Sequence, residues 1–173
     1  MSEFSRMIDP RLLTAAPLHL VASAKECAAL AKRFALVSVE RLEADVALEA
    51  DGAVVKADGR LKAAIVQSCA VSGEELPVAI DAPIALRFVR DDGQHRPNEE
   101  IELEADDLDE IAYSGGQFDL GEEVAQTLAL AIDPYLTGPK ADEARKKAGI
   151  SDESASGPFA ALAALKQDSS SRT

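Results

Sequence analysis

A strict alternation of apolar and polar residues over positions 78–88 constrains this chain more than any other feature. Six apolar side chains occupy every second position of the segment: Val78, Ile80, Ala82, Ile84, Leu86 and Phe88. Successive side chains of a β-strand point to opposite faces of a sheet, so this pattern predicts a strand with one buried face. Pro83 lies on the opposite face and cannot donate a ladder hydrogen bond, which predicts a sheet edge or a bulge there.

Two preceding segments extend the pattern into an antiparallel meander. Residues 37–50 alternate in the same way, and Asp51-Gly52 is a strong signal for a two-residue hairpin loop. The next strand is expected from Ala53 to about Cys69, with Gly59 interpreted as an in-strand glycine that marks a bulge. Short additional strands are expected over 17–21 and around 111–113.

Two helices are predicted from their start signals. Ser23 or Ala24 opens a helix that extends to about Phe34, and Asp119 opens a helix over 120–132. Each start carries a glutamate at the capping-box position, three residues after the capping residue. A third, short charged helix is expected over 140–148.

The predicted fold class is α+β. It consists of an antiparallel β-meander of about four to six strands packed with two main helices, and closure into a barrel is left open. We expect a single domain over 1–150 and a flexible C-terminal tail over 151–173, with a short amphipathic segment at 158–166.

The charge and cysteine content argue against a general nucleic-acid binder and against a secreted, disulfide-bonded protein. The chain has 18 basic and 31 acidic side chains and a net charge of −13, so a basic protein is a better-matched partner than a polyanion. Cys27 and Cys69 are too few for a disulfide scaffold, which favours a reduced intracellular protein. The N-terminus lacks a secretory signal, and no segment approaches the ~20 apolar residues that span a bilayer. We therefore expect a cytoplasmic protein with no membrane partner.

Two segments are candidates for partner binding. The first is an acidic run without a basic residue, which could be a solvated face or a docking surface for a basic protein: Glu99, Glu100, Glu102, Glu104, Asp106, Asp107, Asp109 and Glu110. Screening of RNA-binding grooves by this run ranks lower. The second is the sequence PFAALAALK, in which Phe159, Leu162 and Leu165 share a face. It either packs back on the domain or forms a short partner-binding helix.

The sequence contains no recognisable catalytic or metal-binding constellation. His19 lies in an apolar strand and His95 in a polar loop, and neither is near a serine or cysteine in a nucleophile motif. A zinc site needs about four Cys or His ligands at close spacing, and these two histidines and two cysteines do not provide it. We predict no catalytic residues, no metal and no cofactor.

Two stretches resemble signatures of the YceD family. VVKADGRLKAAIVQSCAVSGEELPVAI (54–80) is similar to the family segment in which a strand leads into a Cys-x-x-Cys knuckle followed by Pro-Val. FDLGEEVAQTLALAIDPYLTGP (118–139) is similar to the second signature, and PFAALAALK to the ending of alphaproteobacterial members. The residues that carry the resemblance are Gly59, Leu61, Cys69, Pro77, Asp119, Leu120, Gly121, Asp133, Pro134 and Tyr135.

The resemblance implies a non-enzymatic role in accumulation of the large-subunit ribosomal RNA, and hence in ribosome assembly or rRNA processing. Some members carry two cysteine pairs that suggest a zinc knuckle. Here Ser72 stands where the second thiol would be, and the region 133–139 has no cysteine, so the metal does not carry over.

Three function hypotheses follow. The leading one is a ribosome-biogenesis factor that binds a basic ribosomal or rRNA-processing protein, with any rRNA contact indirect. The alternative is direct rRNA binding by a local basic patch formed by Arg60, Lys62, Arg87, Arg90 and Arg96. An enzyme is the third, and it would need His19 or His95 in a pocket beside a carboxylate or a cysteine.

Overall fold

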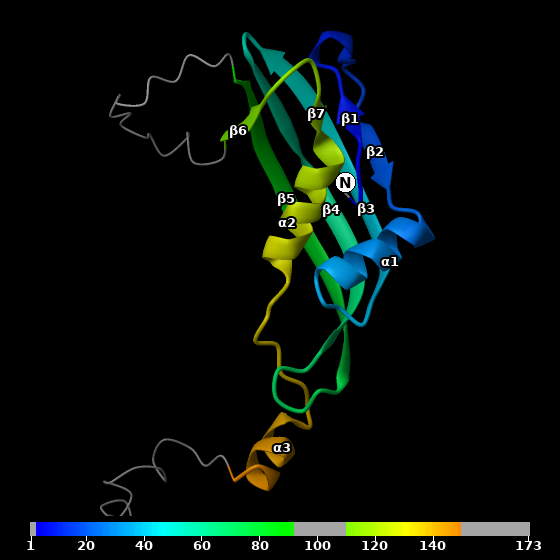
Figure 1. The fold of residues 1–173 in the computed structure, drawn as a ribbon, viewed down its shortest axis with the longest axis vertical. Coiled ribbons are helices and arrows are strands. Elements are labelled where there is room, and N and C mark those ends of the chain that lie inside the picture. The colour runs from blue at the N-terminus through cyan, green and yellow to red at the C-terminus, as the bar shows by residue number, and fades with distance from the viewer. Residues whose placement is uncertain (1–2, 92–109, 150–173) are drawn as a thin grey trace, which may run out of the picture. The chain divides into compact units, whose positions relative to one another are not determined.

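The alternating segments form an open, five-stranded sheet in the order β2-β3-β4-β5-β6 (Figure 1). The computed structural model describes residues 3–91 and 110–149, and the statements below concern these residues. The strands of this sheet are β2 (Leu18–Val21), β3 (Ser38–Asp51), β4 (Val54–Ser68), β5 (Glu75–Arg90) and β6 (Glu110–Tyr113). All five were expected from the sequence, and the alternating burial of β3, β4 and β5 confirms one core face for each.

The β3–β4 hairpin turns one residue later than predicted. Asp51 still pairs with Val54, so the loop residues are Gly52 and Ala53 rather than Asp51 and Gly52. Gly52 has a φ of 63°, a left-handed conformation that glycine adopts without a Cβ penalty. Glycine at the first loop position is one of the two arrangements that suit a two-residue hairpin.

The prediction of a bulge at Gly59 is wrong. Gly59 lies directly opposite Val46 in an uninterrupted ladder, and the register shifts instead between Val39 and Arg41. The glycine is there because β3 approaches too closely for a side chain, as described below.

The sheet is neither fully antiparallel nor closed. β6 runs parallel to β5, from Arg87 opposite Glu110 to Arg90 opposite Tyr113. A parallel neighbour needs a crossover connection, and the intervening segment lies outside the described residues. Within the described part of the chain, β2 and β6 are the two edges and no sheet closes into a barrel, which settles the alternative left open above.

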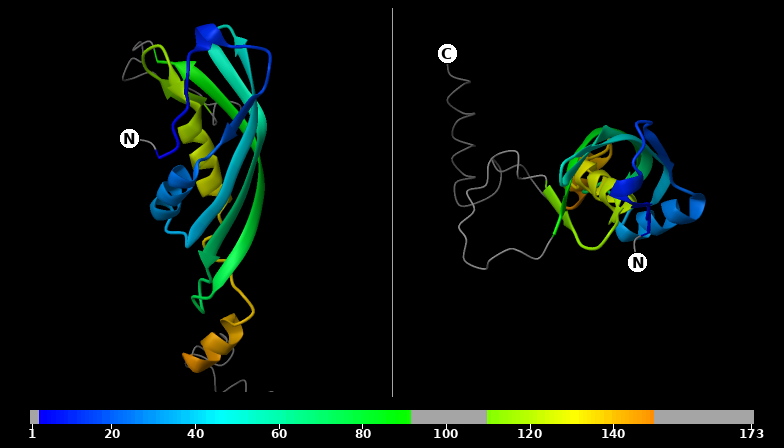
Figure 2. Two further views of the ribbon diagram at one scale, coloured as in Figure 1. Left: turned by 90° about the vertical axis from the view of Figure 1, so that its right-hand side faces the viewer. Right: turned by 90° about the horizontal axis from the view of Figure 1, so that it is seen from above.

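Two helices cover the concave side of this curved sheet (Figure 2). α1 (Ala24–Arg33) begins at Ser23, whose side chain and that of Glu26 form the predicted reciprocal capping box. α2 (Leu120–Ala131) begins at Asp119 as predicted and ends one residue earlier than expected. Their apolar stripes face the sheet, which is why both amphipathic patterns fold as helices here.

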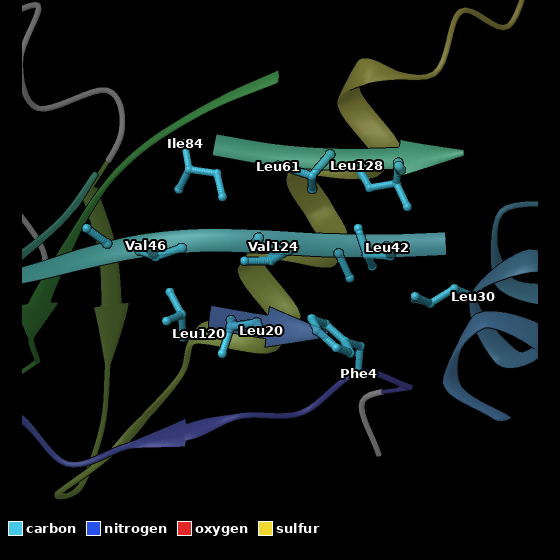
Figure 3. Close-up of a cluster of buried hydrophobic side chains, with 14 of the residues drawn as sticks. Phe4, Leu20, Leu30, Leu42, Val46, Leu61, Ile84, Leu120, Val124 and Leu128 are labelled. Atoms are coloured by element: carbon cyan, nitrogen blue, oxygen red, sulfur yellow. The ribbon is translucent and has the colours of Figure 1, made fainter. Parts of the chain in front are cut away.

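The core lies between α2 and the sheet, and the N-terminal segment completes it (Figure 3). Phe4 is fully buried beside this core, although no sequence pattern predicted its burial. Two short elements hold the segment: β1 (Met7–Ile8), which pairs with β7 (Phe118–Asp119), and the 3-10 helix η1 (Pro10–Leu12). The largest fully buried side chains are Phe4, Phe88, Leu30, Leu42, Leu61, Ile65, Leu120, Leu128, Val46 and Val124. Each such side chain contributes about 1.5–3 kcal/mol by leaving water.

The described residues divide into two compact units. The first contains α1, α2 and the sheet except for the adjoining ends of β4 and β5, and the second consists of residues 68–76 and 134–149. The second unit contains α3 (Ala141–Lys147), which confirms the short charged helix predicted over 140–148. None of the helices in the described ranges is long and apolar enough to cross a membrane.

Candidate functional site

The first signature glycine, Gly59, is required by the contact between two strands. A Cβ at this position would collide with the carbonyl oxygen of Asp45 and lie 2.9 Å from the Cα of Val46. Both are backbone atoms of β3, so no side-chain rotation relieves the contact. Leu61, two residues later, is fully buried on the core face of β4. These two signature residues therefore shape the sheet and the core.

The second signature, Asp119-Leu120-Gly121, joins the N-terminal segment to the start of α2. One carboxylate oxygen of Asp119 accepts hydrogen bonds from the backbone N–H of Glu122 at 3.2 Å and of Arg6 at 2.7 Å. Leu120 is fully buried, and its N–H donates to the Arg6 carbonyl at 3.0 Å. A Cβ on Gly121 would meet the Phe4 carbonyl and lie 2.8 Å from the Arg6 nitrogen. The signature is thus a docking point for the N-terminal segment.

Asp119→Ala should destabilise the protein by about 1–2 kcal/mol, because it removes the helix cap and leaves the Arg6 N–H without its acceptor. Urea unfolding of the two proteins measures this difference. Asp119→Asn is the matched control, since an amide oxygen still caps the helix, and it should retain most of the stability. Equal losses in the two variants would show that the cap is not the relevant interaction.

Asp133, the next signature residue, acts through its backbone. Its carbonyl accepts a 2.7 Å hydrogen bond from the Nε2 of Gln67, which is 93% buried at the end of β4. This bond ties the chain after α2 to the sheet. Pro77, Pro134 and Tyr135 are exposed, and Tyr135 is 82% exposed.

Cys69 lies at the centre of a small knuckle in the second unit. Its sulfur accepts backbone N–H groups from Val71 at 3.5 Å, from Ser72 at 3.3 Å and from Gly138 at 3.3 Å. The first two belong to the turn after β4, while Gly138 belongs to a segment 69 residues away in sequence. The knuckle that the resemblance implied is therefore present as a shaped loop.

The same knuckle is fixed at a second point by Glu74. The Oε1 of Glu74 accepts the backbone N–H of Lys140 at 2.9 Å and lies 3.1 Å from the Ser72 hydroxyl oxygen. In the same region the N–H of Ala70 donates to the carbonyl of Leu136 at 2.9 Å. No sequence motif predicted this role of Glu74.

These hydrogen bonds lower the pKa of the Cys69 thiol to about 6. The Ser72 side chain is the largest cause, followed by the backbone N–H of Gly138. The Ser72 hydroxyl has a single proton, which it can donate either to the sulfur or to the Glu74 carboxylate. The backbone N–H donors lower the pKa of Cys69 whichever acceptor the hydroxyl chooses. Burial instead raises the pKa of the other thiol, Cys27. A sulfur that receives N–H groups favours its anionic form.

No group of three or more His, Cys, Asp or Glu side chains among the described residues is arranged to hold a metal ion. His19 pairs with Asp45 at 2.7 Å on the surface of the sheet, where their side chains are 58% and 68% exposed. His95 lies outside the described residues.

The basic residues of the alternative RNA patch have acidic neighbours. Arg60 pairs with Asp81 at 2.8 Å, and Arg87 pairs with Glu110 at 3.3 Å. Lys62 stands opposite Glu43 in the β3–β4 ladder. Arg90 lies at the exposed end of β5, and Arg96 is outside the described residues.

Most of the predicted partner-binding residues also fall outside the described residues. This holds for Phe159, Leu162, Leu165 and seven members of the acidic run: Glu99, Glu100, Glu102, Glu104, Asp106, Asp107 and Asp109. Only Glu110 is described, at the start of β6.

Comparison with known families agrees with these signatures. The model of the family described as "Large ribosomal RNA subunit accumulation protein YceD" matches residues 57–166, more than half of the chain. The chain belongs to the YceD family. No curated protein and no solved structure matches it.

Membership of the YceD family implies a role in accumulation of the large-subunit rRNA, in a family of ribosome-biogenesis factors. The match begins in β4, three residues into the first signature stretch, and contains every signature residue named above. It leaves out the N-terminal segment, although Phe4 and Arg6 contact the second signature directly. Sequence reasoning missed these two residues because a lone Phe in a polar segment carries no periodic signal.

Proposed function

We propose that this YceD-family protein supports accumulation of large-subunit rRNA without catalysis, by binding a basic ribosomal or rRNA-processing protein. The observation that carries the proposal is the family match over residues 57–166. The ending PFAALAALK supports an alphaproteobacterial-type member.

The charge distribution supports a protein partner rather than RNA. Arg60 and Arg87 already face carboxylates, so a polyanion would have to displace Asp81 and Glu110 to reach them. Exposed ion pairs contribute only about 0–1 kcal/mol, so such an exchange is feasible. Direct rRNA binding through these residues is therefore the second candidate.

The excess of carboxylates supports a basic partner. Eight of the 31 acidic side chains lie within residues 99–110, which contain no basic residue. A half-buried carboxylate of α2 adds to this excess: burial raises the pKa of Glu123, and its neighbours Glu122 and Asp119 raise it further. Glu122 already pairs with Arg33 at 2.6 Å, so Glu123 is the α2 carboxylate that a cation from a partner would stabilise.

Depletion of the protein should lower the ratio of large-subunit to small-subunit rRNA, and re-expression should restore it. A triple variant with glutamine at Glu99, Glu100 and Glu102 should restore this ratio less well than wild type. The matched control neutralises three exposed acids of the sheet, Glu40, Glu49 and Asp58, and should behave as wild type. An unchanged rRNA ratio after depletion would reject the proposed role. Full rescue by the Glu99 variant would reject the acidic run as the docking surface.

A further inference from the structure

The zinc knuckle suggested for some YceD members does not fit the residues of this chain. Zinc in a structural site takes four ligands, usually Cys or His. The turn after β4 offers the thiol of Cys69, the carboxylate of Glu74 and the hydroxyl of Ser72, which is a poor zinc ligand. The opposing segment 134–140 (PYLTGPK) contains no Cys, His, Asp or Glu at all. Cys69 and Glu74 therefore fall short of the four ligands of a structural zinc site, and the opposing segment supplies none.

The two segments are nevertheless joined at three points. The Gly138 N–H donates to the Cys69 sulfur, and the Lys140 N–H donates to the Glu74 carboxylate. The third point is the backbone bond from Ala70 to Leu136. The sulfur and the carboxylate each accept from their own turn as well, so both bridge the segments as a metal ligand set would.

Close packing accompanies these bonds at Gly138. A Cβ there would lie 2.6 Å from the Oε1 of Glu74 and 2.6 Å from a methyl group of Leu76. Because Gly138 has no side chain, its N–H can reach the Cys69 sulfur while the Glu74 carboxylate packs against its Cα.

We propose that the Cys69 sulfur and the Glu74 carboxylate close this knuckle without metal, by accepting backbone N–H groups from the segment 134–140. Cys69 is a positioning residue in this arrangement, and its sulfur is an acceptor rather than a metal ligand. The knuckle thereby keeps its shape and holds the Pro134-Tyr135 end of the second signature in place.

The closure should depend on pH. The folded thiol has a pKa of about 6, below the ~8.5 of a free cysteine. A lowered pKa adds stability that is complete above the unfolded pKa and is lost as the pH falls through the folded pKa. The charged groups of the two segments nearest the sulfur are Glu74, which opposes the thiolate, and Lys140, which contributes its backbone N–H. The knuckle should therefore loosen as the pH falls from ~8.5 to about 6, and change little below that.

Hydrogen–deuterium exchange of the full chain tests the proposal directly. In Cys69→Ala the Gly138 and Lys140 amides should exchange at least about tenfold faster than in wild type, after correction for intrinsic rates. Cys27→Ala is the matched control: it removes the other buried thiol, whose sulfur lies 3.9 Å from the Ala22 carbonyl in the first unit. The two amides should be unaffected in this control.

Two measurements on the wild-type protein keep the proposal testable if the variant does not fold. Elemental analysis of protein purified without chelator, and again after addition of zinc chloride, should give far less than one zinc per chain. Chelator should leave the exchange of both amides unchanged, and lowering the pH should accelerate it after the same correction. Stoichiometric zinc, faster exchange with chelator, or normal protection in a folded Cys69→Ala would each overturn the metal-free closure. None of these readouts depends on rRNA, so their failure is separable from failure of the proposed function.

Discussion

Gly59→Ala is expected to prevent stable folding of the sheet. The new methyl group would overlap the Asp45 carbonyl and crowd the Cα of Val46, in the middle of the β3–β4 ladder. Neither backbone atom can move without breaking the pairing on both sides, so the loss should exceed about 4 kcal/mol, more than most single substitutions cause. Urea unfolding monitored by circular dichroism gives the difference in the free energy of unfolding.

Gly116→Ala is the matched control for this experiment. The same methyl group there would have only the Arg11 Nη2 within 4 Å, at an ordinary distance of 3.8 Å. Its unfolding free energy should stay within about 0.5 kcal/mol of wild type. A Gly59→Ala protein as stable as this control would show that β3 and β4 are not as close as described.

Gly121→Ala is expected to release the N-terminal segment from α2. Alanine is favoured over glycine inside a helix by about 1 kcal/mol, so helix propensity alone predicts stabilisation. The clash with the Phe4 carbonyl and the Arg6 nitrogen reverses the sign, because those atoms are backbone. The segment is held by a two-residue strand, so it should detach and lose the burial of Phe4, at a cost of about 3 kcal/mol.

Amide exchange at Leu120, whose N–H donates to the Arg6 carbonyl, reports this release directly. Phe4→Ala should produce a similar loss of stability, because it removes the same buried side chain. Unchanged protection of Leu120 in Gly121→Ala would contradict the docking of the segment.

The elements that the sequence predicted correctly are those with a local signal. The alternation in β5, the capping box of α1 and the Asp119 cap of α2 are all readable within a dozen residues. The features that the sequence did not predict are set by tertiary contacts. The parallel placement of β6 and the burial of Phe4 depend on partners far away in the chain.

In the candidate site too, the sequence identified the signature residues, whereas their roles depend on tertiary contacts. Gly59 and Gly121 stood out in the sequence, but only the structure shows that each makes room for a neighbouring backbone. The position of Cys69 in the sequence predicted a knuckle, and the structure shows that its sulfur accepts backbone N–H groups from two segments. A metal site can be predicted from sequence because its ligands are particular residue types at particular spacings. Backbone N–H donors cannot be predicted in this way, because almost every residue has one.

We propose that this YceD-family protein supports accumulation of large-subunit rRNA through a protein partner. Affinity purification of the full chain from growing cells, before and after ribonuclease treatment, tests it most directly. We expect at least one basic protein of the large subunit or of rRNA processing to stay bound after the RNA is digested, and high salt to release it. Loss of every such protein on ribonuclease treatment, with the RNA bound directly to the chain, would contradict a protein partner.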